Sequence, residues 1–500
     1  MQTAGPPRRR SRIRIFQMNP SVATSSKDRL SSIEADGSRK AIHPADVKGR
    51  FVRRRRIVYA MLILIYLALP FVRIDGKPAV FLDIANRSFY LFGRTFNAQD
   101  FWLVVFLLTS LGFSLLFFTA WLGRVWCGWA CPQTVFLEGV YRRVERFFEG
   151  PRNQRLKLHN SPWTKEKILR RGGKYLTFLL ISLVLSHIFL SYFVSLPSLF
   201  QMIQDGPAAH PTAFGWMVAV TGLLMFDFAW FREQLCVVVC PYGRLQSAMH
   251  DDQSLVIGYD VARGEPRGKL RRAERVALPQ VSSGATAAPA RGDCIDCQRC
   301  VMVCPTGIDI RDGLQMECIG CAQCVDACDE VMEKIGKPKG LIRYDSLAGL
   351  AGRPRKMVRP RLFLYGTLLF AALSGLTIGL FFRTPFEANV LRIRGVPYVL
   401  EEETIRNQFE LHLVNKNPHP ARFRVQVDSP VEADLTLPTD TVTIGSLESY
   451  RLPVFVRVRK EDYREPFTID FQVLDESTSR TKVTTGTFLG PSSNHERDAS

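Results

Sequence analysis

The fold of this 500-residue chain is decided by the stretch C294-I-D-C-Q-R-C-V-M-V-C304-P, which continues after a loop as C318-I-G-C-A-Q-C-V-D-A-C328. Each half has the spacing C-x2-C-x2-C-x3-C. Four thiolates can bind the irons of one [4Fe–4S] cube, and gaps of two residues let three cysteines wrap a cube in a tight loop. The stretch therefore predicts a domain that holds two iron–sulfur clusters.

The fourth cysteine of each run is expected to bind the other cluster, as it does in two-cluster ferredoxins. This assigns one cluster to Cys294, Cys297, Cys300 and Cys328, and the second to Cys318, Cys321, Cys324 and Cys304. Zinc also binds paired C-x2-C motifs. Two complete runs, the first followed by Pro305, favour iron–sulfur. The second run ends without the proline but keeps all its ligands.

The other four of the twelve cysteines form two pairs, in W126-C-G-W-A-C131-P and C236-V-V-V-C240-P. Cysteines at i and i+4 share one helical face, so each pair is expected to close a transmembrane helix that its proline stops. Two such pairs could present four thiolates to one soft metal, such as Cu(I), zinc or an iron–sulfur centre. Ordinary buried cysteines, a third cluster and a redox dithiol are the alternatives. No cysteine is left over, which favours metal ligation over disulfide crosslinks.

Five apolar runs are long enough, or nearly so, to cross a bilayer as helices, for which about 20 residues are needed. They cover roughly residues 57–72, 101–122, 175–196, 214–231 and 362–382, and the first carries Pro70 near its end. The sequence thus predicts a polytopic α-helical membrane protein with five spans.

The net charge of +19 is unevenly distributed. Lys and Arg number fifteen in residues 1–56, twelve in 123–174 and twenty in 232–361, but four in 73–99 and none in 197–212. Because basic loops stay in the cytoplasm, the first three segments are predicted to be cytoplasmic and the last two external. The basic residues then act as topology signals with contacts to anionic lipid, and nucleic-acid binding is not expected. All twelve cysteines fall on the reducing cytoplasmic side or at that membrane face.

Residues 387–490 change to short alternating stretches separated by Asn, Pro, Asp and Gly. The stretches are F409-E-L-H-L-V, F423-R-V-Q-V, T441-V-T-I, L452-P-V-F-V-R-V and F467-T-I-D-F-Q-V. Alternation with period two at regular spacing predicts an immunoglobulin-like antiparallel β-sandwich. This domain has no cysteine and no visible catalytic constellation, and its expected role is docking to a partner outside the membrane.

The predicted organisation has eight segments. They are a disordered basic cytoplasmic tail (1–56), a membrane domain with four helices and both C-x3-C-P sites (57–257), a linker (258–293), a ferredoxin-type 2[4Fe–4S] domain (294–345), a second linker (346–361), a fifth transmembrane helix (362–382), a periplasmic Ig-like domain (387–490) and a disordered tail (491–500).

Weaker candidates lie among the apolar runs. His187 in the third run could contact a metal or quinone, because ionisable groups inside a membrane are costly and often functional. Asp227 in the fourth run could instead pair with Arg232 or Arg244. His210 and Met202 in an outer loop could touch copper, although two isolated residues do not make a site.

With both cysteine sets and the sandwich in view, the chain resembles the FixG/CcoG/RdxA-type accessory proteins of cbb3-type cytochrome oxidase, from about residue 47 to residue 490. The resemblance is carried by G49-R-F, V125-W-C-G-W-A-C-P-Q-T-V-F136, L235-C-V-V-V-C-P-Y-G-R-L-Q246, both ferredoxin-type runs and the terminal domain.

The resemblance implies a bacterial inner-membrane protein that binds copper and reduces Cu(II) to Cu(I) for assembly of the oxidase. Its implied partners are copper ions and the oxidase assembly factors or copper chaperones. It implies [4Fe–4S] ligation by the eight ferredoxin-run cysteines, and copper binding at Cys127, Cys131, Cys236 and Cys240.

Three functional hypotheses follow. In the first, a cytoplasmic donor reduces the clusters, and electrons pass to a metal on the four membrane-face thiolates, which makes the protein a cupric reductase. In the second, the protein is an electron conduit between that donor and quinone or a periplasmic reductase. In the third, it is a non-enzymatic, redox-sensing scaffold whose Ig-like domain is the working surface.

Overall fold

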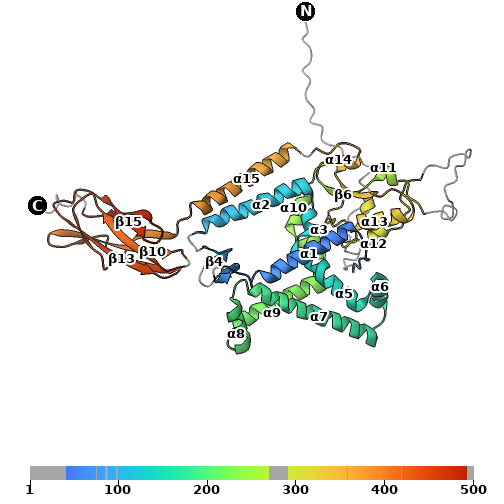
Figure 1. Cartoon of the computed structure of the whole chain (residues 1–500), viewed down its shortest axis with the longest axis horizontal. Coiled ribbons are helices and arrows are strands. Elements are labelled where there is room, and N and C mark those ends of the chain that lie inside the picture. Colours follow the sequence, from blue (N-terminus) through green and yellow to red (C-terminus); the bar gives the residue numbers. More distant parts are fainter. Residues whose placement is uncertain are drawn as a thin grey trace, which may run out of the picture. The chain divides into compact units, whose positions relative to one another are not determined.

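The computed structural model describes residues 41–269 and 291–491, apart from 75, 85–87, 97–99, 357, 394, 418 and 447. The chain forms two compact units, whose elements are labelled in Figure 1. The first unit comprises Met1–Leu69, Ser110–Ser191 and Leu196–Phe370, and the second comprises Pro70–Thr109, Tyr192–Ser195 and Ala371–Ser500. The helices α2 (Trp102–Leu122) and α15 (Pro360–Phe381) contribute residues to both units.

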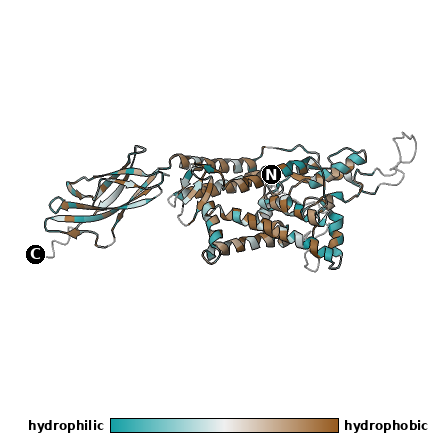
Figure 2. Ribbon diagram, turned by 60° about the horizontal axis from the view of Figure 1, so that its bottom comes forward, coloured by the Kyte–Doolittle hydropathy of each residue, from teal (hydrophilic) through white to brown (hydrophobic). Residues whose placement is uncertain are grey.

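Within the described residues, four helices are long and apolar enough to cross a membrane. They are α2, α7 (Lys165–Leu190), α9 (Pro211–Met225) with its continuation η4 (Phe226–Phe231), and α15. Figure 2 shows hydrophobic residues along much of their length. The helix α1 (Arg50–Ala68) is not among the four, because its first turns carry Arg50 and Arg53–Arg56. Its crossing of the membrane, and hence the fifth span, stays a prediction.

The start of α1 corrects the prediction of a disordered tail through residue 56. Residues 50–56 are helical, and the segment before them packs on the cluster domain through the buried side chain of Val47. The Asp326 carboxylate accepts hydrogen bonds from the backbone N–H groups of Phe51 (3.3 Å) and Val52 (2.8 Å). A carboxylate suits a helix N-terminus. A Cβ on Gly49 would lie 2.2 Å from Asp326 Cγ, which explains the glycine of G49-R-F. Residues 1–40 of the predicted tail lie outside the described residues.

Glycines of α15 let that helix approach α2 closely. In the first unit, a Cβ on Gly366 would lie 3.3 Å from the Phe117 ring, and in the second unit a Cβ on Gly375 would lie 2.6 Å from the Phe106 ring. Small residues at helix contacts are typical of membrane proteins, where close backbone approach provides van der Waals packing. The first unit has a further helical core at η3 (Leu137–Tyr141), α7 and η4, where the buried Tyr141 stacks on Phe228.

The remaining helices of the first unit are short. They are α3 (Val125–Trp129), α4 (Pro132–Phe136), α5 (Arg142–Glu149), α6 (Arg152–Asn160), α8 (Leu196–Asp205), η5 (Leu235–Val239), α10 (Pro241–Met249), α11 (Val261–Gly264), α12 (Arg299–Met302), η7 (Ile310–Asp312), α13 (Gln323–Lys334) and α14 (Leu347–Leu350).

The cluster domain begins earlier in the chain than predicted. Strand β6 (Val256–Tyr259) pairs antiparallel with β7 (Ile342–Asp345), so residues assigned to the membrane domain and the first linker form part of this domain. Helices α12 and α13 each follow the first two cysteines of a run. Both begin after a left-handed residue, Gln298 (φ 55°) and Ala322 (φ 60°), so the two runs have the same local conformation. Residues 270–290 of the predicted linker lie outside the described residues.

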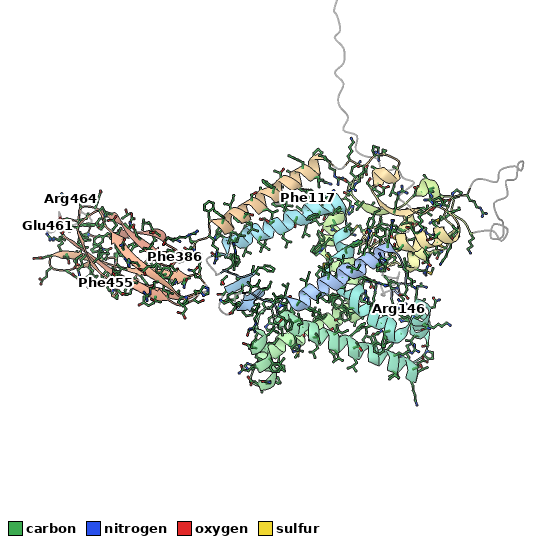
Figure 3. All side chains as sticks on the ribbon, in the orientation of Figure 1. Phe117, Arg146, Phe386, Phe455, Glu461 and Arg464 are labelled. Carbon is green, nitrogen blue, oxygen red and sulfur yellow. The ribbon has the colours of Figure 1, made fainter. Side chains whose placement is uncertain are left out.

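The C-terminal part of the second unit is a two-sheet β-sandwich, as predicted, with its core phenylalanines between the sheets (Phe386 is labelled in Figure 3). One sheet has the order β12-β14-β10-β8 with β9 paired to β10, and the other has the order β13-β11-β15-β16. The strands are β8 (Phe386–Arg392), β9 (Val399–Leu400), β10 (Thr404–Asn415), β11 (Ala421–Asp428), β12 (Ala433–Thr436), β13 (Thr441–Ile444), β14 (Ser449–Arg459), β15 (Phe467–Asp475) and β16 (Arg480–Phe488). The predicted alternating stretches all lie within strands.

The second unit also contains two small sheets that the sequence patterns did not predict. They are formed by β1 (Arg73–Ile74) with β2 (Lys77–Pro78), and by β3 (Val80–Asp83), β4 (Ser88–Leu91) and β5 (Arg94–Phe96). Buried Asp100 pairs with Lys416 (2.9 Å) and Arg383 (2.8 Å), which ties the start of α2 to the sandwich.

Candidate redox site

The eight cysteines of the two runs line two cavities, and each cavity contains one of the predicted sets of four. One cavity is lined by Cys294, Cys297, Cys300 and Cys328. The other is lined by Cys304, Cys318, Cys321 and Cys324, and Cys300 lines it as well. The fourth cysteine of each run thus lies with the first three of the other run, as expected for two-cluster ferredoxins.

Both cavities suit a resident iron–sulfur cluster. Their other lining residues are mainly apolar, including Ile308, Ile310 and Ile319 in one and Met332 and Leu341 in the other. Burial raises the pKa of Cys318 to about 12 and that of Cys321 to about 11. Such thiols stay neutral at pH 7 unless a bound metal compensates the thiolate charge, which is the chemistry that cluster ligation supplies.

The C-x3-C-P pairs do not lie on continuous helices, which corrects the sequence prediction. Cys127 is in α3 and Cys236 is in η5, whereas Cys131 and Cys240 are the N-caps of α4 and α10. Pro132 and Pro241 occupy the first turn of the following helix. Proline is favoured there because the first N–H groups of a helix have no intrahelical partner. Each proline therefore starts a new helix and does not simply end the old one.

The two pairs share one backbone turn. The N–H of Cys131 donates to Trp126 O (2.9 Å), and the N–H of Cys240 donates to Leu235 O (2.7 Å), five residues back in each case. This common turn places the second cysteine of each pair at a helix N-terminus. Hydrogen bonds from the backbone N–H groups of Gln133 and Thr134 partly offset the burial that raises the pKa of Cys131.

The structure brings the two pairs together, although more than a hundred residues separate them in sequence. Burial and the charges of Cys131 and Cys240 raise the pKa of Cys127 to about 12. Burial, followed by the charges of the other three cysteines, raises the pKa of Cys236. The Cys127 Sγ–H donates to Gln246 Oε1 at 3.2 Å. The four cysteines thus lie near enough for their charges to interact, and we call them the four-thiol group.

The four-thiol group contacts the loop that lines the cavity of Cys304, Cys318, Cys321 and Cys324. Gly128 lies so close that a Cβ on it would be 2.7 Å from Ile319 O and 2.9 Å from the backbone N of Cys321. Only a residue without a side chain fits there. Trp129 Nε1 also donates to Tyr344 Oη (3.1 Å), whose hydroxyl donates to Gly320 O.

Arg124 joins both C-x3-C-P elements to that loop. Its guanidinium donates to the carbonyl oxygens of Cys318 (3.1 Å), Met316 and Gly243, and its Nε donates to Gln246 Oε1 (3.1 Å). Sequence patterns alone do not identify Arg124, Gly128 or Gln246 as site residues. Their positions inside or next to the two C-x3-C-P elements are the only signal, since their partners are distant in sequence.

Of the weaker candidates, Asp227 lies near the four-thiol group, because its charge contributes to the raised pKa of Cys236, whereas His187 and His210 have partners elsewhere. His187 Nδ1 is 2.8 Å from Leu183 O in its own helix. Asp227 accepts from Gln133 Nε2 (3.0 Å), whereas Arg232 pairs with Glu145, so the predicted pair with Arg232 is not formed. His210 pairs with Asp205 (3.2 Å). Among the described residues, no three His, Cys, Asp or Glu side chains are grouped for one metal ion, and this applies to the cluster cysteines as well.

Comparison with known proteins places these features in a family. Residues 231–347 match a 4Fe-4S dicluster domain, residues 101–151 match a 4Fe-4S binding domain, and residues 376–491 match the Ig-like fold at the C-terminus of FixG. Protein RdxB of Cereibacter sphaeroides is 39% identical over 453 residues, covering 87% of this chain and 91% of that protein. This chain belongs to the FixG family. Nitrogen fixation protein FixG of Rhizobium meliloti is 34% identical and covers 85% of this chain and 88% of its own length.

A second relative, protein RdxA of Cereibacter sphaeroides, is 39% identical over 78% of this chain and 82% of its own length. The crystal structure of a FixG-related protein from Vibrio parahaemolyticus aligns along its whole length with 22% of this chain, at 19% identity and a TM-score of 0.21. Membership of the FixG family identifies the chain as a membrane iron–sulfur protein with an electron-transfer role. The two iron–sulfur matches also include the C-x3-C-P cysteines.

Proposed function

We propose that this FixG-family protein transfers single electrons from a cytoplasmic donor to Cu(II) at Cys127, Cys131, Cys236 and Cys240, and supplies Cu(I) for assembly of a cbb3-type oxidase. The observation that carries the proposal is the packing of Gly128, between Cys127 and Cys131, directly on the Cys321 backbone. The four-thiol group, which would hold copper, is therefore in contact through Gly128 with the loop that would hold a cluster.

The residues that would hold the two [4Fe–4S] clusters are those that line the two cavities. Clusters bound there supply single electrons at low potential. Cys297 is exposed, whereas Cys300 is buried and lines both cavities. The cavity that contains Cys297 thus opens to solvent. The cavity that contains Cys321 adjoins both the first cavity and the four-thiol group. This order suits entry of electrons from a soluble donor at Cys297.

The four-thiol group suits Cu(I) as the product. One electron reduces one Cu(II) to Cu(I), and thiolates favour the softer ion over oxygen-rich ligands. Because burial keeps the Cys127 and Cys236 thiols neutral, metal binding must release their protons. The N-cap position of Cys131 favours the resulting thiolate, since backbone N–H groups point toward its sulfur.

The proposed topology places the N-terminus and the cluster domain in the cytoplasm and the Ig-like domain in the periplasm. Its support is the distribution of Lys and Arg. The apolar run of residues 57–72 supports α1 as the fifth span.

The test is Cu(II) reduction by the purified full-length protein after its clusters are chemically reduced, in the wild type and in Cys127→Ser and Cys236→Ser. We expect both variants to keep the iron content and the cluster EPR signal of the wild type and to lose most of the reduction rate. Undiminished rates in both variants would exclude the assigned site. Oxidation of the clusters by quinone, with no copper bound, would favour an electron conduit.

A second candidate for the four-thiol group is a third [4Fe–4S] cluster, because both iron–sulfur family matches extend over C-x3-C-P cysteines. Metal analysis of anaerobically purified protein separates the two. About eight irons with copper bound support the copper site, whereas about twelve irons, at four per cluster, support a third cluster. In Cys127→Ser, iron stays constant under the first alternative and falls by about one third under the second.

A further inference from the structure

A separate cavity of about 120 Å³ in the first unit is lined by six arginines. They are Arg55 and Arg56 of α1, Arg142, Arg143 and Arg146 of α5, and Arg155 of α6. Arg146 on α5 is labelled in Figure 3. Since one water needs roughly 10–15 Å³ of such space, the cavity has room for a group as large as a phosphate. We call it the arginine pocket.

The charges of the arginine pocket are not balanced by its own carboxylates. Only two acidic residues, Asp46 and Glu138, line it against six arginines. Asp46 already pairs with Arg146 at 2.7 Å, and Glu138 already pairs with Arg142. Two carboxylates outside the pocket, Glu233 and Glu145, pair with Arg142 (3.2 Å) and Arg155 (3.6 Å). No ion pair of Arg56 or Arg143 occurs with any residue that the structure describes. Burial, together with the neighbouring charge of Arg56, lowers the pKa of Arg143. The mouth of the pocket therefore has uncompensated positive charge.

The floor of the arginine pocket has donors without acceptors. Arg142 and Arg155 are 8% and 4% exposed, yet the Nε–H of each has no hydrogen-bond partner in the described part of the chain. Leaving a buried donor unpaired costs ~1–3 kcal/mol, and more for a charged group. An anion whose oxygens reach these Nε–H groups would remove this cost.

We propose that the arginine pocket binds a phosphate group. Guanidinium forks match the geometry of phosphate oxygens, and pairs with phosphate are frequently bidentate. The phosphate could belong to the headgroup of an anionic phospholipid or to a free phosphate ester. The chain around the pocket suits a headgroup, because Arg56 is followed directly by the apolar part of α1 from Ile57 onward. Basic pockets between membrane helices are known to bind such headgroups.

The pocket also touches the second cluster loop. Gln323, which stands next to Cys324, is one of its lining residues, and the Arg55 Nε–H donates to Gly128 O at 2.9 Å. A bound phosphate would therefore lie beside the residues that connect the cluster loop with the C-x3-C-P site. This inference does not depend on copper as the substrate.

The test measures binding to full-length protein that has been stripped of lipid in detergent. Two probes are titrated, inorganic phosphate and phosphatidylglycerol. The test variant is Arg56→Gln/Arg143→Gln, which changes the exposed mouth only. Its matched control is Arg53→Gln/Arg54→Gln, which removes two exposed arginines of the same helix that do not line the pocket. Iron content and circular dichroism establish that each variant is folded.

We expect saturable binding of at least one probe to the wild type and to the control, and binding roughly tenfold or more weaker in the test variant, since a charge-assisted hydrogen bond is about twice as strong as a neutral one. Binding of phosphatidylglycerol that inorganic phosphate does not displace identifies a lipid headgroup as the source. Binding of inorganic phosphate with no preference for the lipid identifies a free phosphate ester. Binding of neither probe, or equal binding to the wild type and the test variant, would overturn the proposal.

Discussion

The two groups of cysteines in this protein differ in how they are spaced along the sequence and in how far they are buried. The eight cysteines of the ferredoxin-type runs lie within 35 residues of sequence, from 294 to 328, and line two cavities of mainly apolar side chains. Four of these eight are buried, and Cys297 alone is exposed. The four C-x3-C-P cysteines come from two distant segments, and none of them is fully buried.

The difference indicates different roles. Closed sites with all ligands from the protein are typical of resident metals, whereas sites that act on a substrate keep an open position. The two cavities, each lined by a full set of four cysteines, therefore suit permanent cofactors, whereas the four-thiol group, which lines neither cavity, suits a metal that enters and leaves. Gly128 and Arg124 hold the two kinds of site against each other, so variants at these residues can test whether the two must touch.

The largest effect is expected from removing a cluster ligand. Cys304→Ser should remove about half of the iron, because four thiolates hold each cube. Since Cys304 lines the cavity of Cys318, Cys321 and Cys324, the EPR signal that remains should match that of Cys318→Ser. The matched comparison is Cys328→Ser, whose remaining signal should match that of Cys297→Ser. A signal in Cys304→Ser that matches Cys297→Ser would mean that each run holds its own cluster.

The second-largest effect is expected from a change that separates the two sites without removing any ligand. In Gly128→Ala the new Cβ would lie within 3 Å of Ile319 O and the Cys321 backbone, so the two loops must move apart. Overpacking of this kind costs ~1–3 kcal/mol. We expect Cu(II) reduction to slow by roughly tenfold or more, because a misplacement of about 1 Å can cost ~100-fold in rate. Iron content should not change.

The control for this change is Gly112→Ala in α2, where a new Cβ has no heavy atom within 4 Å. It should reduce Cu(II) at the rate of the wild type. If Gly128→Ala also keeps the wild-type rate while hydrogen exchange shows altered loops, close contact between the two sites is not needed for electron transfer.

Local patterns were enough to predict much of this arrangement. The spacing of the cysteine runs predicted which four residues line each cavity, because ligand geometry is encoded within a few residues. Alternation in F409-E-L-H-L-V and the similar stretches predicted strands of the sandwich. The same reasoning missed β16, whose R480-T-K-V-T-T-G-T-F488 has Thr and Lys where the outward face is solvated and few apolar residues to mark the inward face.

Other features could not be predicted because they depend on distant partners. The sequence predicted that Pro132 ends a helix, but the Cys131 turn makes it the first residue of the next one. Residues 50–56 looked disordered because they are highly basic, yet Asp326, about 275 residues away, caps the helix they start. Arg124 has its acceptors at Met316, Cys318 and Gly243, and no spacing rule connects these positions.

A smaller effect is expected from Arg124→Gln. The change leaves the Cys318 and Gly243 carbonyl oxygens without the guanidinium donor, and an unsatisfied buried group costs ~1–3 kcal/mol. The loop of residues 316–320 should exchange its amide hydrogens faster, and Cu(II) reduction should fall less than in Gly128→Ala. Arg54→Gln, on the exposed face of α1, is the control and should change neither measurement. Unchanged exchange in Arg124→Gln would show that Arg124 does not hold the loop.

The smallest effect is expected from Gln246→Ala, which removes the acceptor of the Cys127 thiol without touching a sulfur atom. A neutral hydrogen bond contributes about 0.5–1.5 kcal/mol net, which corresponds to roughly a two- to tenfold change in a binding constant. Because this bond stabilises the protonated thiol, and metal binding requires the thiolate, its loss should tighten Cu(I) binding slightly. Competition with a chromophoric Cu(I) chelator measures the change, and Gln201→Ala on the exposed face of α8 is the control. Weaker Cu(I) binding in Gln246→Ala would mean that the amide positions the bound metal and does not merely hold the free thiol.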